Sequence, residues 1–287
     1  VEKYVAAYKE IALAMKAADP TIRVGPYLGV PGTEQTDAYI KALLTDGSIP
    51  VDYIGYRPES TGLALASVGG DVSAISEALH KINDRELACQ TAVGKIASAC
   101  GRNVPRMPVM VCEWNLDGGK TETEVLGKSM AMTLGITETV LTYASMTRFF
   151  AAAYANSPNA TPMANLAFSA LYETIGDGMA YSAKSPNEPF RLYVTLDRKE
   201  NDVAVWGLNF TETQIIKFNL SIINPPIKPK KVLLKRLAPR AGASSLKSGP
   251  DVITGWVTTD VTSKFLSKLG GFEFAIDPAT ISILLIQ

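Results

Sequence analysis

The sequence predicts an α/β region followed by an all-β region, and two observations support this fold class. Over roughly the first 175 residues, apolar positions recur at helical spacing and short apolar runs lie between the helical segments. From about Phe190 onward, short runs rich in β-branched and aromatic residues alternate with turn residues. A chain of 287 residues is long enough for two structural units. We therefore expect one domain at 1–178 and a second at 179–287.

The α/β region opens with a helix and a strand–helix repeat. Residues 1–19 place apolar side chains at helical spacing, and Pro20 ends this helix. A short strand is predicted over Ile22–Gly25 and a helix over Gln35–Leu44. The next strand is predicted over Val51–Tyr56.

A long apolar stripe leads into the third predicted strand. The stripe runs from Val72 to Cys100 and is interrupted only by Glu86, which predicts two consecutive helices, ended by Gly101. Pro108–Cys112 is continuously apolar, as expected of a parallel strand buried on both faces.

The last part of the α/β region supplies one more strand between two helices. Thr121 and Glu124 form a capping-box pattern that opens a helix continuing through Leu134. A strand over Arg148–Tyr154 and a helix over Pro162–Ile175 follow. Four strand–helix repeats amount to half of a (β/α)₈ barrel, so we expect the C-terminal half of a TIM barrel.

The all-β region contains six short runs with β-type composition. They are Leu192–Leu196, Val203–Leu208, Ile215–Leu220, Val232–Leu234, Gly271–Phe274 and Ile281–Ile286. No further helical pattern is visible after the first of them. Short strands separated by turns predict a β-sandwich behind the half-barrel.

Charge and composition argue against several classes of function. Lys+Arg and Asp+Glu both number 28, so the zero net charge gives no electrostatic attraction to nucleic acid or to an anionic membrane. No apolar run approaches the roughly 20 residues that span a bilayer. The three cysteines form no C-x-x-C pair, and His80 is the only histidine, which leaves little material for metal sites or Ser-His-Asp triads. We expect no metal, no cofactor and three buried free thiols.

Catalytic groups of (β/α)₈ barrels lie at the carboxyl ends of the strands, which directs attention to the residues there. Those residues are Tyr27 after the first strand, Tyr56 and Arg57 at the second, and Glu113, Trp114 and Asn115 after the third. Glu113 follows its strand with no intervening turn, and a carboxylate in that position is costly to bury unless it is paired. Trp114 offers the flat apolar face on which sugar rings stack. The alternative is that Glu113 is merely the first solvated residue after a buried strand.

Pro108–Asn115, with its Glu113-Trp114-Asn115 motif, resembles the seventh barrel strand of clan A glycoside hydrolases. It is most similar to the arabinofuranosidase, β-xylosidase and endoglucanase families. The opening segment through Val24 resembles their fourth helix and fifth strand, and Val51–Tyr56 resembles the sixth strand. Residues 272–285 resemble the last strands of their accessory sandwich. The resemblance therefore covers nearly the whole chain, as the C-terminal part of such an enzyme.

The resemblance implies retaining hydrolysis of O-glycosidic bonds in oligo- or polysaccharides. Glu113 would be the nucleophile, and a second carboxyl about 5 Å away would serve as acid and then base. In these families the second residue is a Glu preceded by Asn at the end of the fourth strand. The only Asn-Glu pair here, Asn187-Glu188, follows the last helix. We therefore expect the acid/base upstream, in a missing N-terminal half of the barrel or in another chain.

The predicted second strand departs from the family pattern. Several of these families carry a His and an aromatic residue there, whereas this chain has Gly55-Tyr56-Arg57. Tyr56 could hydrogen-bond Glu113, and Arg57 could favour its charged form as a nearby cation. Glu34 and Glu59 lie in predicted loops, where positioning is too loose for a replacement acid.

Two interpretations besides an enzyme stay open. The chain could be a non-catalytic carbohydrate-binding or structural fragment whose sandwich binds glycan. It could also be an α/β protein of another kind with an unrelated sandwich.

Overall fold

The computed structural model describes most of the chain and divides it into two compact units. The described residues are 1–58, 72–102, 107–114, 129–145, 149–154, 161–176, 178–183, 189–221, 229–239, 253, 255–268 and 271–287. Unit 1 comprises Val1–Thr61, Lys81–Asn115 and Met146–Ala155, and unit 2 comprises Gly62–His80, Leu116–Ser145 and Asn156–Gln287. The expected domain boundary between 178 and 179 stays a prediction.

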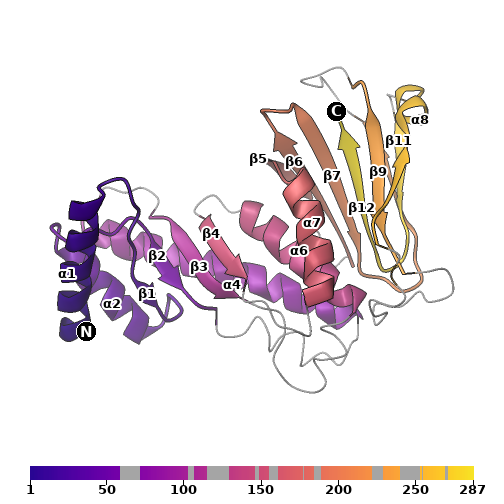
Figure 1. Ribbon diagram of the computed structural model, residues 1–287. Helices are drawn as coiled ribbons and strands as arrows, with labels where there is room; N and C mark the ends of the chain where they lie inside the picture. The colour runs from indigo at the N-terminus through magenta and orange to yellow at the C-terminus, as the bar shows by residue number, and fades with distance from the viewer. Residues whose placement is uncertain are drawn as a thin grey trace. The chain divides into compact units, whose positions relative to one another are not determined.

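Unit 1 is built around a parallel sheet whose strands follow their order in the sequence (Figure 1). The strands are β1 (Tyr27–Leu28), β2 (Ile54–Tyr56), β3 (Val109–Trp114) and β4 (Phe149–Tyr154). Each pairs in parallel with the next. Parallel neighbours require crossover connections, and this order is the one that successive strand–helix repeats produce. The α/β character predicted for this part of the chain is confirmed.

The first strand lies later than predicted. Ile22–Gly25 is not a strand, and β1 covers Tyr27–Leu28 instead. The physical reason lies in the hydrogen bonds of Val24, whose backbone N–H donates to the Asp52 carboxylate at 2.8 Å rather than to a neighbouring strand. The hydrophobic character of the segment reflects burial of Val24, which is 4% exposed.

Among the described residues, three helices contribute to unit 1. They are α1 (Glu2–Ala18), α2 (Glu34–Thr45) and the part of α4 (Val72–Ala99) from Lys81 onward. The hydroxyl of Thr33 caps α2 by accepting a hydrogen bond from the N–H of Thr36, which satisfies one of the free donors of the first turn. Glu34 is the first residue of this helix and is exposed, so the prediction that it lies in a loop is wrong.

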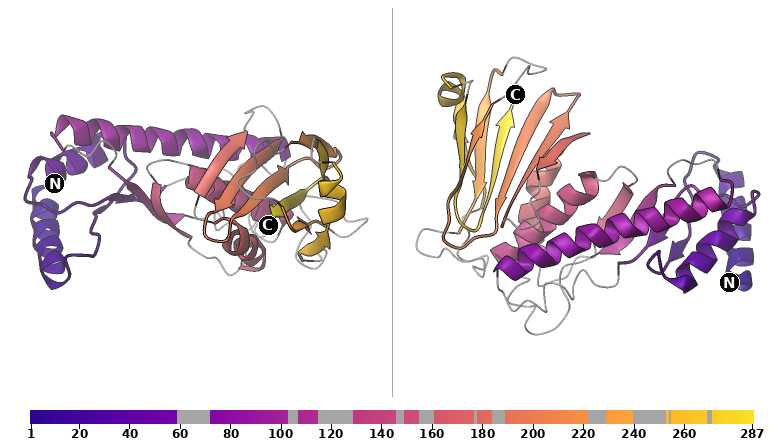
Figure 2. Two further views of the ribbon diagram at one scale, coloured as in Figure 1. Left: turned by 90° about the horizontal axis from the view of Figure 1, so that it is seen from above. Right: turned by 180° about the vertical axis from the view of Figure 1, so that it is seen from behind.

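α4 is one continuous helix of 28 residues, not the two helices predicted (Figure 2). Glu86 does not interrupt the buried stripe but belongs to it, together with Cys89, Val93 and Ala97. These positions recur at three- and four-residue intervals, as one face of a helix requires. The prediction of two helices is wrong because it assumed that the charged residue Glu86 faces solvent.

Unit 2 contains a six-stranded antiparallel sheet and a separate two-stranded sheet. The order in the larger sheet is β10-β9-β12-β7-β6-β5, and β11 pairs with β8. The strands are β5 (Gly178–Ala183), β6 (Phe190–Asp197), β7 (Asp202–Asn209), β8 (Ile216–Leu220), β9 (Val232–Leu237), β10 (Val257–Asp260), β11 (Phe272–Ile276) and β12 (Thr280–Ile286). All six predicted runs coincide with strands, apart from their first residues Ile215 and Gly271, so the sheet-rich character of the C-terminal region is confirmed.

Side chains from both sheets form one hydrophobic cluster. It joins Val205 and Leu284 of the larger sheet to Phe274 and Ile276 of the smaller one. The approach is close at Gly207 in β7, where an added Cβ would collide with Ile276. The two sheets therefore interlock at a position that only glycine can occupy without rearrangement.

Three elements of unit 2 were not predicted. β5 precedes the first recognised β run. All four residues of β10 are exposed, so it lacks apolar alternation. α8 (Thr262–Leu266), with five residues, is too short to establish a helical period, although its Phe265 is buried.

Two further helices belong to unit 2. They are α6 (Met130–Ser145) and α7 (Thr161–Thr174). α6 is buried on nearly all sides, and its four threonines are buried together with its apolar residues. The capping box at Thr121 and Glu124 lies outside the described residues.

A buried ion pair links α6 to the larger sheet. Arg191 of β6 donates from Nε to Glu138 Oε1 at 3.2 Å, and both residues are 1% exposed. The Tyr193 hydroxyl donates to the other carboxylate oxygen at 2.6 Å. Both oxygens of this buried charge are therefore satisfied, which a charge removed from water requires.

Candidate active site

Glu113 lies next to last in β3, with its side chain 43% exposed. The pairing of β3 with β4 shifts register between Val111 and Trp114. Such irregularities re-aim side chains and are common beside active sites. Glu113 is therefore neither packed among aliphatic residues nor fully surrounded by water.

Arg57 is the residue that the structure brings to Glu113. It directly follows β2, and its Nη2 atom lies 3.5 Å from Glu113 Oε1. The two meet because β2 and β3 are parallel neighbours, whose carboxyl ends lie on the same edge of the sheet. An exposed pair of this kind contributes about 0–1 kcal/mol to stability. The importance of the Arg57–Glu113 pair therefore lies in its chemistry, because it keeps a cation beside a carboxylate at the edge of the sheet.

Tyr56 is fully buried and directs its hydroxyl to a carboxylate other than Glu113. The hydroxyl donates to Glu86 Oε2 on α4. Burial raises the pKa of Glu86 to about 8. Sequence reasoning missed this partner, although the lone charge in the apolar stripe of α4 was a visible signal.

The strands approach one another closely just before the Arg57–Glu113 pair. An added Cβ at Gly55 would lie 2.6 Å from Cys112 Sγ and 2.9 Å from the Pro26 carbonyl oxygen. Glycine at position 55 therefore permits this spacing. Cys112 is a free thiol, as are Cys89 and Cys100, but only Cys89 is buried, so the prediction of three buried thiols is wrong for the other two. Burial raises the pKa of Cys112, so it is a poor candidate for a nucleophile at neutral pH.

The other predicted site residues are placed less completely. Tyr27 lies in β1 with 52% of its surface exposed, and its carbonyl oxygen accepts a hydrogen bond from the Tyr4 hydroxyl at 3.2 Å. Trp114 ends β3 and is 2% exposed. Asn115 and Glu59 lie outside the described residues. The parallel sheet puts Arg57 and Glu113 at the carboxyl ends of two neighbouring strands, whereas Tyr27 opens β1 and pairs with Gly55 of β2.

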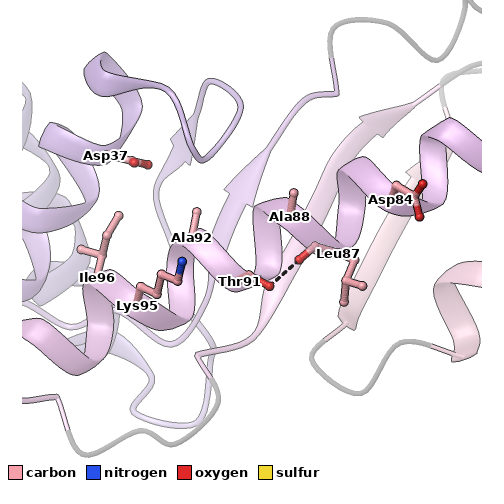
Figure 3. Close-up of a pocket in the computed structure, with 8 residues that line it drawn as sticks. All are labelled: Asp37, Asp84, Leu87, Ala88, Thr91, Ala92, Lys95 and Ile96. Atoms are coloured by element: carbon pink, nitrogen blue, oxygen red, sulfur yellow. Dashed lines mark hydrogen bonds between the residues drawn. The ribbon is translucent and has the colours of Figure 1, made fainter.

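A groove of about 570 Å³ runs along α4 (Figure 3). It is lined by Asp37, Asp84, Leu87, Ala88, Thr91, Ala92, Lys95 and Ile96. None of these is a predicted site residue. Thr91 donates its hydroxyl to the Leu87 carbonyl within the helix at 2.8 Å, so this polar group is already satisfied.

In the part of the chain that the structure describes, no helix is long and apolar enough to cross a membrane. The same residues contain no group of three or more side chains arranged to hold a metal ion.

The chain resembles solved structures of glycoside hydrolases. It matches a GH51 α-L-arabinofuranosidase from Thermotoga petrophila with a TM-score of 0.65 and 13% identity, covering 99% of this chain and 62% of that one. A family 51 α-L-arabinofuranosidase from Bifidobacterium longum gives a TM-score of 0.67 and 10% identity, with 100% and 63% covered. A family 44 xyloglucanase from Paenibacillus polymyxa, solved with xyloglucan, gives 0.67 and 12%, with 100% and 61% covered.

The chain shares its fold with clan A glycoside hydrolases. The predicted resemblance is thereby confirmed at the level of fold, over the whole of this chain. The chain spans less than two thirds of the length of these enzymes. No protein-family model and no curated protein matches the sequence.

Proposed function

We propose that this chain is the C-terminal part of a retaining clan A glycoside hydrolase, with Glu113 as its nucleophile. The observation that supports this most directly is the Arg57–Glu113 pair at the carboxyl edge of a sequentially ordered parallel sheet. The substrate is an oligo- or polysaccharide joined by O-glycosidic bonds. The glycosidase fold of the structural relatives gives the arrangement its chemical context.

In this proposal β1 to β4 are strands five to eight of a (β/α)₈ barrel, and residues 1–178 form its C-terminal half. Residues 179–287 form an accessory β-sandwich. The order of the parallel strands and the hydrophobic cluster shared by the two β-sheets support these assignments. The first half of the barrel, from the same chain or another, is the required partner. Neither nucleic acid nor a membrane has a part.

The reaction is a double displacement. A Glu113 carboxylate oxygen attacks the anomeric carbon while the bond from that carbon to the leaving oxygen breaks, and a second carboxyl gives its proton to that oxygen. Water then attacks the glycosyl-enzyme ester, transferring its proton to the second carboxylate and releasing Glu113. That second residue belongs to the missing half. The Arg57 cation, 3.5 Å from the Glu113 carboxylate, holds that carboxylate in place.

We further propose that Tyr27, Trp114 and Asn115 contact the sugar together with Arg57. Tyr27 has the exposed surface that such a contact needs. Trp114 would reach substrate only at the rim of its buried ring. Tyr56 acts from the opposite direction, as a buried support of the strand end, since its hydroxyl is engaged by Glu86.

The test is covalent labelling of the complete enzyme. A panel of 2,4-dinitrophenyl 2-deoxy-2-fluoroglycosides, including α-L-arabinofuranosides and β-glucosides, traps a glycosyl-enzyme, and peptide mapping locates the label. We expect the label on Glu113. Glu113→Gln should abolish labelling and lower turnover by about 10⁴-fold or more, whereas the matched control Glu34→Gln should behave like the unmodified enzyme. A label on any other residue would contradict the proposal, and no label with any glycoside would favour a non-catalytic carbohydrate-binding role.

A further inference from the structure

Glu86 is a buried carboxyl group that the proposed reaction does not use. It is 1% exposed on the sheet-facing side of α4. Oε2 accepts a hydrogen bond from the Tyr56 hydroxyl, whereas Oε1 has no hydrogen-bond partner among the described residues. A buried carboxyl with one polar contact is tolerated far better neutral than ionised.

The surroundings of Glu86 give an ionised carboxylate little support. Tyr56 approaches it from β2, and Cys89 lies one turn further along α4. Burial, with a contribution from Glu86, raises the pKa of Cys89 to about 12, so this thiol stays neutral. Arg85 and Asp37 act on Cys89 with opposite signs. Because burial raises the pKa of Glu86 to about 8, this group is mostly protonated at pH 7 and mostly ionised at pH 9.

The same contact determines where the end of β2 lies. Tyr56 is the last residue of β2, and Arg57 is the next residue in the chain. On the other side, Gly55 fits closely against Cys112 and Pro26. The strand end is thus held between its neighbouring strands and α4. A displacement of Tyr56 moves the backbone of Arg57, and with it the cation beside Glu113.

We propose that the Tyr56–Glu86 pair positions Arg57 against Glu113 only while Glu86 is protonated. Ionisation of Glu86, with loss of its proton to solvent, leaves a buried charge that α4 and β2 accommodate by separating. Glu86 is therefore a positioning residue that acts on the nucleophile through Tyr56 and Arg57. For its catalytic consequence, this inference rests on the proposed function.

The rate of covalent labelling tests the inference without interference from the acid/base residue. A dinitrophenolate leaving group needs no proton, so labelling by the fluoroglycoside that reacts with the complete enzyme reports on the nucleophile alone. We expect the rate at pH 9 to be about tenfold below that at pH 7, since about one tenth of Glu86 stays protonated one unit above its pKa. In Glu86→Gln the two rates should agree within about twofold.

Two further variants separate positioning from simple structural damage. Asp84→Asn removes an exposed carboxylate from the same helix, and its labelling rate should still fall about tenfold between pH 7 and pH 9. Tyr56→Phe removes the contact without removing the acid and should label more slowly already at pH 7. The inference is overturned if the labelling rate of Glu86→Gln falls between pH 7 and pH 9 as much as that of the unmodified enzyme. It is also overturned if Glu86→Gln labels more slowly than the unmodified enzyme by the same factor at both pH values.

Urea unfolding of the complete protein tests the role of Glu86 even if no glycoside labels it, an outcome that would remove the proposed function alone. An unfolded Glu ionises near 4.5, whereas folded Glu86 does so near 8. Its contribution to stability is therefore complete below pH 4.5 and is lost as pH rises toward 8. We expect this loss in the unmodified chain and not in Glu86→Gln. An equal loss in both would refute the role of Glu86.

Discussion

Arg57 and Glu113 illustrate which parts of the site a sequence reveals. Both could be predicted from their positions at the ends of apolar strands, because the carboxyl ends of parallel strands lie on one edge of the sheet. The structure places them 3.5 Å apart. The partner of Tyr56 could not be found in this way, because the choice between Glu113 and Glu86 depends on which side of the strand the ring faces. That side is set by packing against α4, a contact between residues 30 positions apart.

The Arg57–Glu113 pair gives a prediction at this scale. Arg57→Ala should lower kcat/KM of the complete enzyme by about 10²-fold, since one preorganised charge at the reacting group is lost. Its free energy of unfolding should change by no more than about 1 kcal/mol, because the pair is exposed. Arg57→Lys keeps the charge and should recover part of the rate. Steady-state kinetics and urea unfolding measure the two effects, and an unchanged kcat/KM in Arg57→Ala would remove Arg57 from the mechanism.

At the scale of elements, hydrophobic periodicity located most helices and strands but not all their limits. α2, β3, β4, α7 and most of the β-strands lie close to where they were expected. The errors have physical causes. Val24 is buried without joining a strand, Glu86 is a charge on the buried side of α4, and β10 is a strand with no apolar side. In each case a contact with a segment distant in the sequence determines the local structure, and hydrophobic periodicity does not reveal such contacts.

The attachment of α6 to β6 yields a second prediction, on stability. Arg191→Met leaves Glu138 charged and buried, and should lower the free energy of unfolding by about 3–5 kcal/mol. The double variant Glu138→Leu with Arg191→Met should recover much of this loss, because no lone charge remains. Urea unfolding measures both effects.

An exposed ion pair in the same unit provides the matched control. Lys217 and Glu273, 3.4 Å apart, are more than half exposed, so Lys217→Met should cost no more than about 1 kcal/mol. Equal effects of Arg191→Met and Lys217→Met would show that burial of the first pair does not govern its energetics.

At the scale of the whole molecule, the described parallel sheet has an edge at each end. β1 and β4 each pair with a single neighbour in that sheet. The backbone groups of an unpaired edge strand attract further strands, so the sheet is suited to take up additional ones. The sequence predicted four strands in parallel from the number of its repeats, and the structure has them in that order. Their assignment to half of a barrel stays a proposal, because no residue of the four strands identifies the strands that would extend the sheet.

The open sheet leads to a prediction about assembly. The chain alone should self-associate with increasing concentration, whereas mixing it with a polypeptide that carries barrel strands one to four should give a one-to-one complex that hydrolyses glycosides. Sedimentation velocity and activity measurements check the two outcomes. A chain that stays monomeric at every concentration and ignores the added half would contradict the barrel assignment.

The contact between Gly207 and Ile276 has a consequence for the history of this protein. The bare backbone of one position leaves room for the branched side chain of the other, although 69 residues separate them in the sequence. A bulkier residue at 207 requires the end of the Ile276 side chain to move or a smaller residue to stand at 276, and it also comes close to Phe274. Lineages that diverge from this chain should therefore tend to alter positions 207 and 276 together.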